Sequence, residues 1–105
     1  MEQKYSLVMT SCPDGEVAKA LAGLLVEGRL AACVQIFPIQ SVYTWQGVVH
    51  DEPEIMLLIK TRTMLFERLV EAITANHPYE VPEIVQLPLT GGLSTYLNWI
   101  DENTD

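Results

Sequence analysis

The sequence feature that most constrains the fold is a pair of long, extended apolar segments on either side of a two-residue turn. Residues 31–45, interrupted at Pro38, form the first arm, the Gln46-Gly47 pair reverses the chain, and residues 48–60 return. An arm of roughly 13–15 residues at about 3.3 Å each spans on the order of 45 Å. A globule of this size has a diameter nearer 35 Å, by an estimate of about 13 Å for its radius of gyration. We therefore expect the hairpin to overhang and to pair with another chain, unless Pro38 and Pro53 bend it back.

Shorter patterns predict the other strands. Residues 5–11 are apolar and bounded by the Cys12-Pro13-Asp14-Gly15 turn, and residues 83–89 precede the Gly91-Gly92 break. With two helices between the strands, the order is βαββαβ followed by one extra C-terminal helix. Right-handed crossovers place such a chain in a four-stranded antiparallel sheet, the ferredoxin-like α+β fold.

Three helices are predicted from their end signals. Asp14 is a candidate N-cap for the first helix, which Gly28 should end. Thr63 is a candidate cap for the second, which should stop near Asn76 because a proline follows two residues later. Ser94 is a candidate cap for the short terminal helix.

Alternation along the return arm divides its residues between two sheet faces. Ile55, Leu57 and Ile59 share one face, whereas Met56 and Leu58 share the other. Because both long helices should cover the same face, we expect Met56 and Leu58 to expose an apolar patch. This patch is a second reason to expect an oligomer.

Composition restricts the partners. The 105 residues, 49% hydrophobic and 19% charged, indicate a single domain over residues 1–105. A net charge of −8 with scattered lysines and arginines argues against nucleic acid and membrane surfaces as partners. The N-terminus lacks the pattern of a signal peptide, so we expect a cytoplasmic protein. Cys12 and Cys33 lie too far apart for a Cys-x-x-Cys site, and we expect two reduced thiols.

Motifs of catalysis are missing from the sequence. It has no nucleophile elbow, zinc-binding His-x-x-x-His pair, phosphate-binding loop or dinucleotide fingerprint. We therefore expect that the protein is not an enzyme.

Taken together, five segments resemble the CutA divalent-cation tolerance proteins. They occur in the family's order: residues 30–33 (LAAC), 41–47 (SVYTWQG), 54–61, 77–83 (HPYEVPE) and 96–99 (YLNW). The resemblance covers nearly the whole chain. It implies a cytoplasmic homotrimer of ferredoxin-like subunits, similar in plan to PII-type signalling trimers, and a role in tolerance of copper and other divalent cations.

The same resemblance bears on a copper site. Some relatives are proposed to use a first-strand cysteine and a His-His pair, which correspond here to Thr10 and to Asn76-His77. Only His77 keeps its place, and Cys33 is the second candidate ligand because a thiolate and an imidazole suit copper. The alternatives are that His77 braces a loop by hydrogen bonds and that Cys33 packs as a small apolar residue.

Two further groups of residues are candidates for binding. Residues that could line a ligand cleft between subunits are Glu54, Lys60, Tyr79 and Glu83. Residues expected at the trimer interface are Tyr43, Trp45, Met56, Leu58 and Trp99. Tyr43 and Trp45 could instead line the cleft. We therefore expect a metal ion of the copper type or a small ligand at inter-subunit clefts, or else a PII-like signalling or scaffold module that docks a protein partner.

Overall fold

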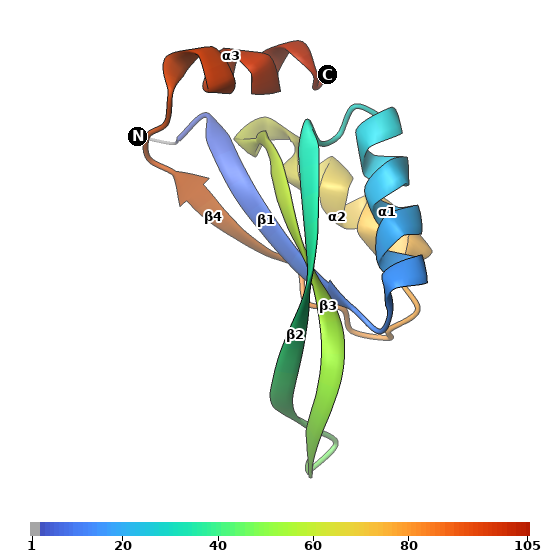
Figure 1. Cartoon of the computed structure of the whole chain (residues 1–105). Coiled ribbons are helices and arrows are strands. Elements are labelled where there is room, and N and C mark those ends of the chain that lie inside the picture. The colour runs from blue at the N-terminus through green and yellow to red at the C-terminus, as the bar shows by residue number, and fades with distance from the viewer. Residues whose placement is uncertain (1–2) are drawn as a thin grey trace.

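The computed structural model describes residues 3–105 as one four-stranded antiparallel sheet with three α-helices (Figure 1). The strands have the order β2-β3-β1-β4. The elements are β1 (Tyr5–Cys12), α1 (Gly15–Glu27), β2 (Cys33–Trp45), β3 (Val48–Arg62), α2 (Phe66–Asn76), β4 (Val85–Leu89) and α3 (Ser94–Glu102). This confirms the predicted order of strands and helices, including the extra C-terminal helix. No helix in the described part is long and apolar enough to span a membrane.

The hairpin of β2 and β3 dominates the shape. It extends beyond the rest of the sheet (Figure 1), and the molecule measures 44 × 27 × 22 Å. Pairing continues from Cys33 with Lys60 to Trp45 with Val48, straight through both prolines. Positive φ angles at Gln46 (50°) and Gly47 (78°) are those of a type I′ turn, whose twist matches that of the strands. Pro38 and Pro53 therefore do not bend the overhang back.

One sheet face is covered by α1 and α2. The apolar core lies there, and Val8, Leu25, Leu57, Leu69 and Ile73 are each fully buried. Helix α1 starts as predicted, since the backbone N–H of Val17 donates to the Asp14 carboxylate at 2.9 Å and Gly28 is its C-cap.

Two predicted helix caps are wrong. A 3₁₀ turn, Thr63–Leu65, precedes α2, and the Thr63 hydroxyl bonds to Ser6 at 2.7 Å instead of capping α2. Ser94 is already the first residue of α3, and its side chain makes no cap bond. In both places the hydrophobic pattern predicts the helix correctly, but the nearby Thr or Ser side chain does not cap it and does not mark where it begins.

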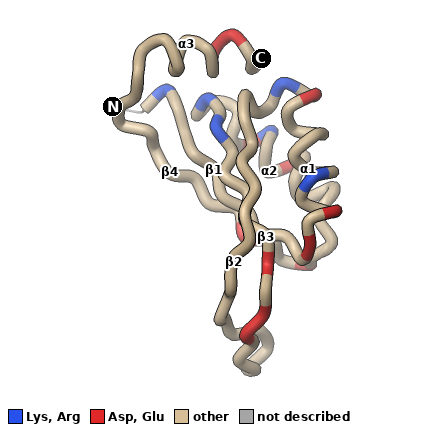
Figure 2. The backbone as a smooth tube through the Cα atoms, in the orientation of Figure 1, with Lys and Arg blue, Asp and Glu red and all other residues tan. Residues whose placement is uncertain are grey.

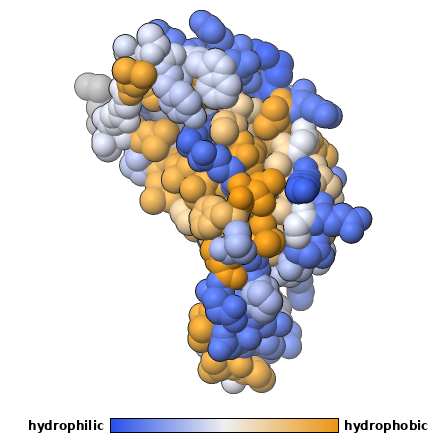
Figure 3. Space-filling view, viewed as in Figure 1, coloured by the Kyte–Doolittle hydropathy of each residue, from blue (hydrophilic) through white to orange (hydrophobic). Residues whose placement is uncertain are grey.

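The opposite sheet face has no helix packed along its length, and apolar residues gather on it (Figure 3). Its edge strands expose Phe37 (40%), Val85 (44%) and Leu87 (42%). The prediction that Met56 contributes to the exposed patch is wrong, because Met56 is only 8% exposed. It lies on the central strand β3 between Ser11 and Phe37, which enclose it from both sides. Leu58 is half-buried, and the exposed apolar surface lies mainly on β2 and β4.

Candidate functional site

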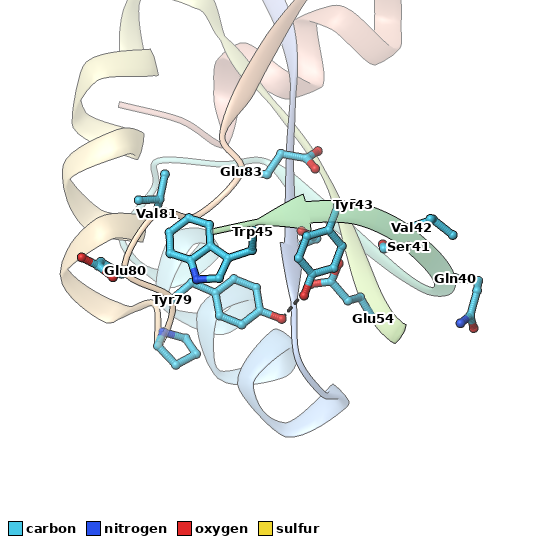
Figure 4. Close-up of a pocket in the computed structure, with 12 residues that line it drawn as sticks. Gln40, Ser41, Val42, Tyr43, Trp45, Glu54, Tyr79, Glu80, Val81 and Glu83 are labelled. Atoms are coloured by element: carbon cyan, nitrogen blue, oxygen red, sulfur yellow. Dashed lines mark hydrogen bonds between the residues drawn. The ribbon is translucent and has the colours of Figure 1, made fainter. Parts of the chain in front are cut away.

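A cavity of about 720 Å³ opens where the hairpin leaves the body of the molecule (Figure 4). Strand β2 supplies Tyr43 and Trp45, and β3 supplies Glu54. The other wall is the segment between α2 and β4, which contributes Tyr79 and Glu83. We call this cavity the hairpin cleft.

Hydrogen bonds fix the acidic groups at the hairpin cleft. The Tyr79 hydroxyl donates to Oε2 of Glu54 at 2.7 Å, and the Tyr43 hydroxyl donates to Glu52. Tyr43 also stacks on His50 with ring centroids 5.2 Å apart. The cleft therefore combines aromatic walls with one carboxyl group, that of Glu54, which a hydrogen bond holds in place.

Both tyrosines keep their protons over a wide pH range. The pKa of Tyr43 is raised to about 12, first by its hydrogen bond to Glu52 and then by burial. The pKa of Tyr79 is raised further, by burial first and then by the bond to Glu54 and its charge. At neutral pH the cleft therefore presents two neutral phenols beside ionisable carboxyl groups.

His77 connects the cleft wall to the sheet. The Tyr79 backbone N–H donates to Nδ1 of His77 at 3.1 Å, so the proton of a neutral ring is on Nε2, which donates to the Ser11 carbonyl at 2.8 Å. Both ring nitrogens are therefore occupied by main-chain partners. This is the loop-bracing role that the sequence left open as the alternative to metal binding.

The nearest sulfur to His77 belongs to Cys12, with Sγ 3.9 Å from Nε2. Cys12 is fully buried, and burial together with the charges of Glu54 and Asp14 raises the pKa of its thiol to about 11. Cys33 lies elsewhere, since it pairs with Lys60, five residues along β3 from the partner of Cys12. At about 3.3 Å per residue this separates the two positions by roughly 16 Å.

These residues do not fit a bound copper ion. His77 offers no free nitrogen, the adjacent thiol is protonated, and the two predicted ligands His77 and Cys33 are not brought together. Among residues 3–105, no group of three or more His, Cys, Asp or Glu side chains has the spacing of a metal site. Thr10, which stands where the resemblance would place a cysteine ligand, is buried and its hydroxyl has no hydrogen-bond partner.

The structure brings together part of the predicted cleft set. Glu54, Tyr79 and Glu83 line the cavity, as do Tyr43 and Trp45, which were expected at the interface or in the cleft. Lys60 does not line it, because its ammonium lies 5.4 Å from the Tyr96 ring at the α3 end of the sheet. Trp99, 39% exposed, stacks on Tyr96 in the same region.

Some residues of the cleft were not anticipated from the sequence. They are Ser11, Gln40, Ser41, Val42, Pro78, Glu80 and Val81. Glu80 belongs to the same short segment as Tyr79 and Glu83, so its position in the sequence could have predicted that it lines the cleft. Ser11 and Gln40 come from strands whose register places them beside the cleft, which the sequence alone did not specify.

Comparison with known proteins gives one consistent result. Residues 6–103 match the model of the family described as CutA1 divalent ion tolerance protein. The divalent-cation tolerance protein CutA of Thermus thermophilus is 50% identical over 99 residues, which cover 93% of this chain and 96% of that protein. A chloroplastic CutA protein of Arabidopsis thaliana is 48% identical over 93% of this chain but 54% of its own length.

Solved structures agree with the sequence matches. The structure of the Thermus thermophilus divalent cation tolerance protein superposes with a TM-score of 0.93 at 49% identity, over 96% of this chain and 99% of that one. The overhanging hairpin, the antiparallel sheet and the three helices are therefore those of a known fold. The chain belongs to the CutA1 divalent ion tolerance protein family.

Proposed function

We propose that the protein acts in divalent-cation tolerance as a cytoplasmic homotrimer that binds a small ligand in the hairpin cleft, where one copy meets the next. The observation that carries this proposal is the incomplete surface of a single chain. Phe37, Val85 and Leu87 expose apolar area on the sheet face without a helix, and the hairpin tip exposes Val49 (70%) beyond the body. A stable chain rarely leaves such a contiguous surface uncovered.

Self-association would also give the hairpin cleft its missing wall. Tyr43 and Trp45 are each 39% exposed although they line the cavity, so one side of it is open in the lone chain. A neighbouring copy packed on the same face would enclose these rings. The proposed ligand site is then a property of the assembly.

Light scattering at low micromolar concentration tests the assembly. A subunit of 11.8 kDa should appear at about three times that mass. A particle with the mass of one chain would contradict the proposal, because the open cleft would then have no second wall.

Direct copper binding is the competing candidate, favoured by the proximity of the His77 ring to the Cys12 thiol. It requires breaking the bonds of His77 to Ser11 and Tyr79, and deprotonating a thiol whose pKa is about 11.

Calorimetric titration of copper and zinc into the wild type and the variants His77→Ala and Cys12→Ala separates the two candidates. Micromolar binding that disappears in both variants supports a direct metal site, and Cys33→Ala is the control because its thiol lies away from the His77 ring. Heats that are unchanged in His77→Ala and Cys12→Ala support tolerance through a ligand or partner.

A PII-like signalling or scaffold role without metal chemistry agrees with the occupied nitrogens of His77. In that case the assembly transmits the presence of its ligand to a protein partner, and we propose no catalytic step. Screening the purified protein against phosphate esters checks this point. Hydrolysis of a phosphate ester that co-purifies with the assembled protein and is lost in Glu54→Gln would argue for an enzyme.

A further inference from the structure

We propose that the ligand of the hairpin cleft is a small organic ammonium ion, held by the Glu54 carboxylate and the surrounding aromatic rings. The inference rests on the proposed function, because it names a chemical class for the cleft proposed there. It differs from a metal site in its donors, its shape and its test.

The first argument is a buried carboxyl group with an incomplete set of partners. Glu54 is 8% exposed, and its one hydrogen bond in the described residues is the Tyr79 hydroxyl at Oε2. No lysine, arginine or histidine nitrogen of residues 3–105 lies within 4.0 Å of it. A buried carboxylate ordinarily has a cation or several donors beside it, so Glu54 lacks a positive partner on its cavity side.

The segments that line the cleft supply no lysine or arginine that could pair with Glu54. No lysine or arginine occurs between Arg29 and Lys60 or after Arg68, and every residue lining the cleft except Ser11 comes from those two stretches. In Figure 2 the overhanging part of the hairpin has red acidic positions and no blue ones, whereas Lys60 and Arg62 lie at the other end of β3. The cleft thus attracts cations and repels anions.

The aromatic rings favour an organic cation over an inorganic one. Tyr43, Trp45 and Tyr79 surround the space next to Glu54 (Figure 4). Ring faces attract ammonium groups and also cover the apolar carbons attached to them. A strongly hydrated inorganic ion would gain little from these faces, whereas an amine with a carbon body makes both kinds of contact within the 720 Å³ cavity.

The charge of Glu54 also acts on two neighbouring groups, which gives a bound cation a second measurable effect. Its charge contributes to the raised pKa of the Cys12 thiol, after burial, and of the Tyr43 phenol, after the bond to Glu52 and burial. A bound cation would oppose both effects.

Calorimetric titration with benzylamine in amine-free phosphate buffer tests the proposal on the full chain. We expect benzylamine to bind and its neutral counterpart, benzyl alcohol, to bind at least tenfold more weakly. In Glu54→Gln, which keeps the shape of the side chain, benzylamine should lose at least tenfold in affinity. Glu71→Gln is the control, because Glu71 is an exposed carboxylate on α2 that does not line the cavity, and it should change affinity less than about twofold.

A second variant gives an effect of opposite sign. Tyr79→Phe keeps the ring but removes the one donor to Glu54, so the carboxylate should hold benzylamine about two- to fivefold more tightly. A site that merely needs an intact fold would not gain affinity in this way. Circular dichroism and light scattering on each variant confirm that the fold and the mass are unchanged.

Several outcomes would overturn the proposal. They are wild-type protein that ignores benzylamine, equal affinity in the wild type and Glu54→Gln, and benzyl alcohol that binds as tightly as benzylamine. If Glu54→Gln instead weakens the assembly and no amine binds, a basic side chain of a second copy is the partner of Glu54, which also overturns it. An assembled protein without amine binding refutes the ligand class alone, whereas a single-chain mass refutes the proposed function.

Discussion

The two faces of the sheet differ in how complete they are. On the face under α1 and α2, Leu57, Leu69 and Ile73 are fully buried by residues of the same chain. On the other face, Phe37 and Leu87 remain about 40% exposed, although their strands are paired with their neighbours. The difference indicates that the first face stabilises the single chain and that the second is available for association.

The largest expected effect comes from a charge on the open face. If the proposed trimer forms through this face, Phe37→Asp should reduce it to single chains, because a buried unpaired carboxylate cannot be tolerated at the contact of two copies. Light scattering measures the mass and circular dichroism checks the fold. The matched control is Met64→Asp, which adds the same charge at an exposed apolar side chain in the 3₁₀ turn and should keep the assembled mass. An assembled Phe37→Asp protein would show that this face is not the contact.

The next effect is on the covered face. Leu57→Ala should lower the free energy of unfolding by about 2–5 kcal/mol, because it leaves a cavity in a core that helices close. Urea unfolding in the Phe37→Asp background, where association does not contribute, measures it. Leu87→Ala in the same background is the control and should cost less than about 1 kcal/mol, since much of that side chain is exposed to water in the lone chain. Equal losses of unfolding free energy in Leu57→Ala and Leu87→Ala would contradict the difference between the two sheet faces.

Much of the difference between the two sheet faces can be predicted from the sequence. The alternation from Ile55 to Ile59 assigned the two faces of β3 correctly, and the Gln46-Gly47 turn set the register of the hairpin. The degree of exposure could not be predicted in the same way. It depends on lateral neighbours, which bury Met56 on a central strand and leave Phe37 exposed on an edge strand.

The candidate site was predictable only in part. The family-like segments marked Glu54, Tyr79 and Glu83, but the segment that begins at Glu54 also includes Lys60, which does not line the cleft. The length of the strand carries Lys60 away from the cleft. The occupied nitrogens of His77 depend on main-chain groups of Ser11 and Tyr79, and no residue pattern reports where a carbonyl points.

Two buried threonines on the covered face differ in their hydrogen bonds, and the expected effects on stability are about 1 kcal/mol. Thr61 donates to the Leu30 carbonyl at 2.7 Å, whereas the Thr10 hydroxyl has no partner among residues 3–105, and both are fully buried. Thr61→Val should therefore destabilise by about 1–2 kcal/mol, and Thr10→Val should stabilise by up to about 1 kcal/mol. Thermal or urea unfolding compares the pair. A loss of stability in Thr10→Val would indicate a hydrogen bond to water at that position.

The smallest effect concerns α3. The pKa of Asp101 lies below its ordinary value, chiefly because the Tyr5 hydroxyl donates to it at 2.6 Å, with Lys4 donating at 3.1 Å. A lowered folded-state pKa stabilises the fold above the unfolded value of about 3.9, and this contribution is lost as the pH falls through the folded value. Asp101→Asn should lower the melting temperature by about 1–3 °C at pH 7. The difference should shrink as the pH falls below the unfolded value and through the folded one, and a difference that does not shrink would assign it to packing.

Strand β1 is hydrogen-bonded to other parts of the chain at both of its ends. At one end the Ser11 carbonyl is held by His77, whose ring also holds Tyr79 in the cleft wall, and at the other end Tyr5 is bonded to Asp101 in α3. A ligand that displaced Tyr79 would therefore disturb the ring of His77 and its bond to Ser11, at one end of the strand whose other end is bonded to α3.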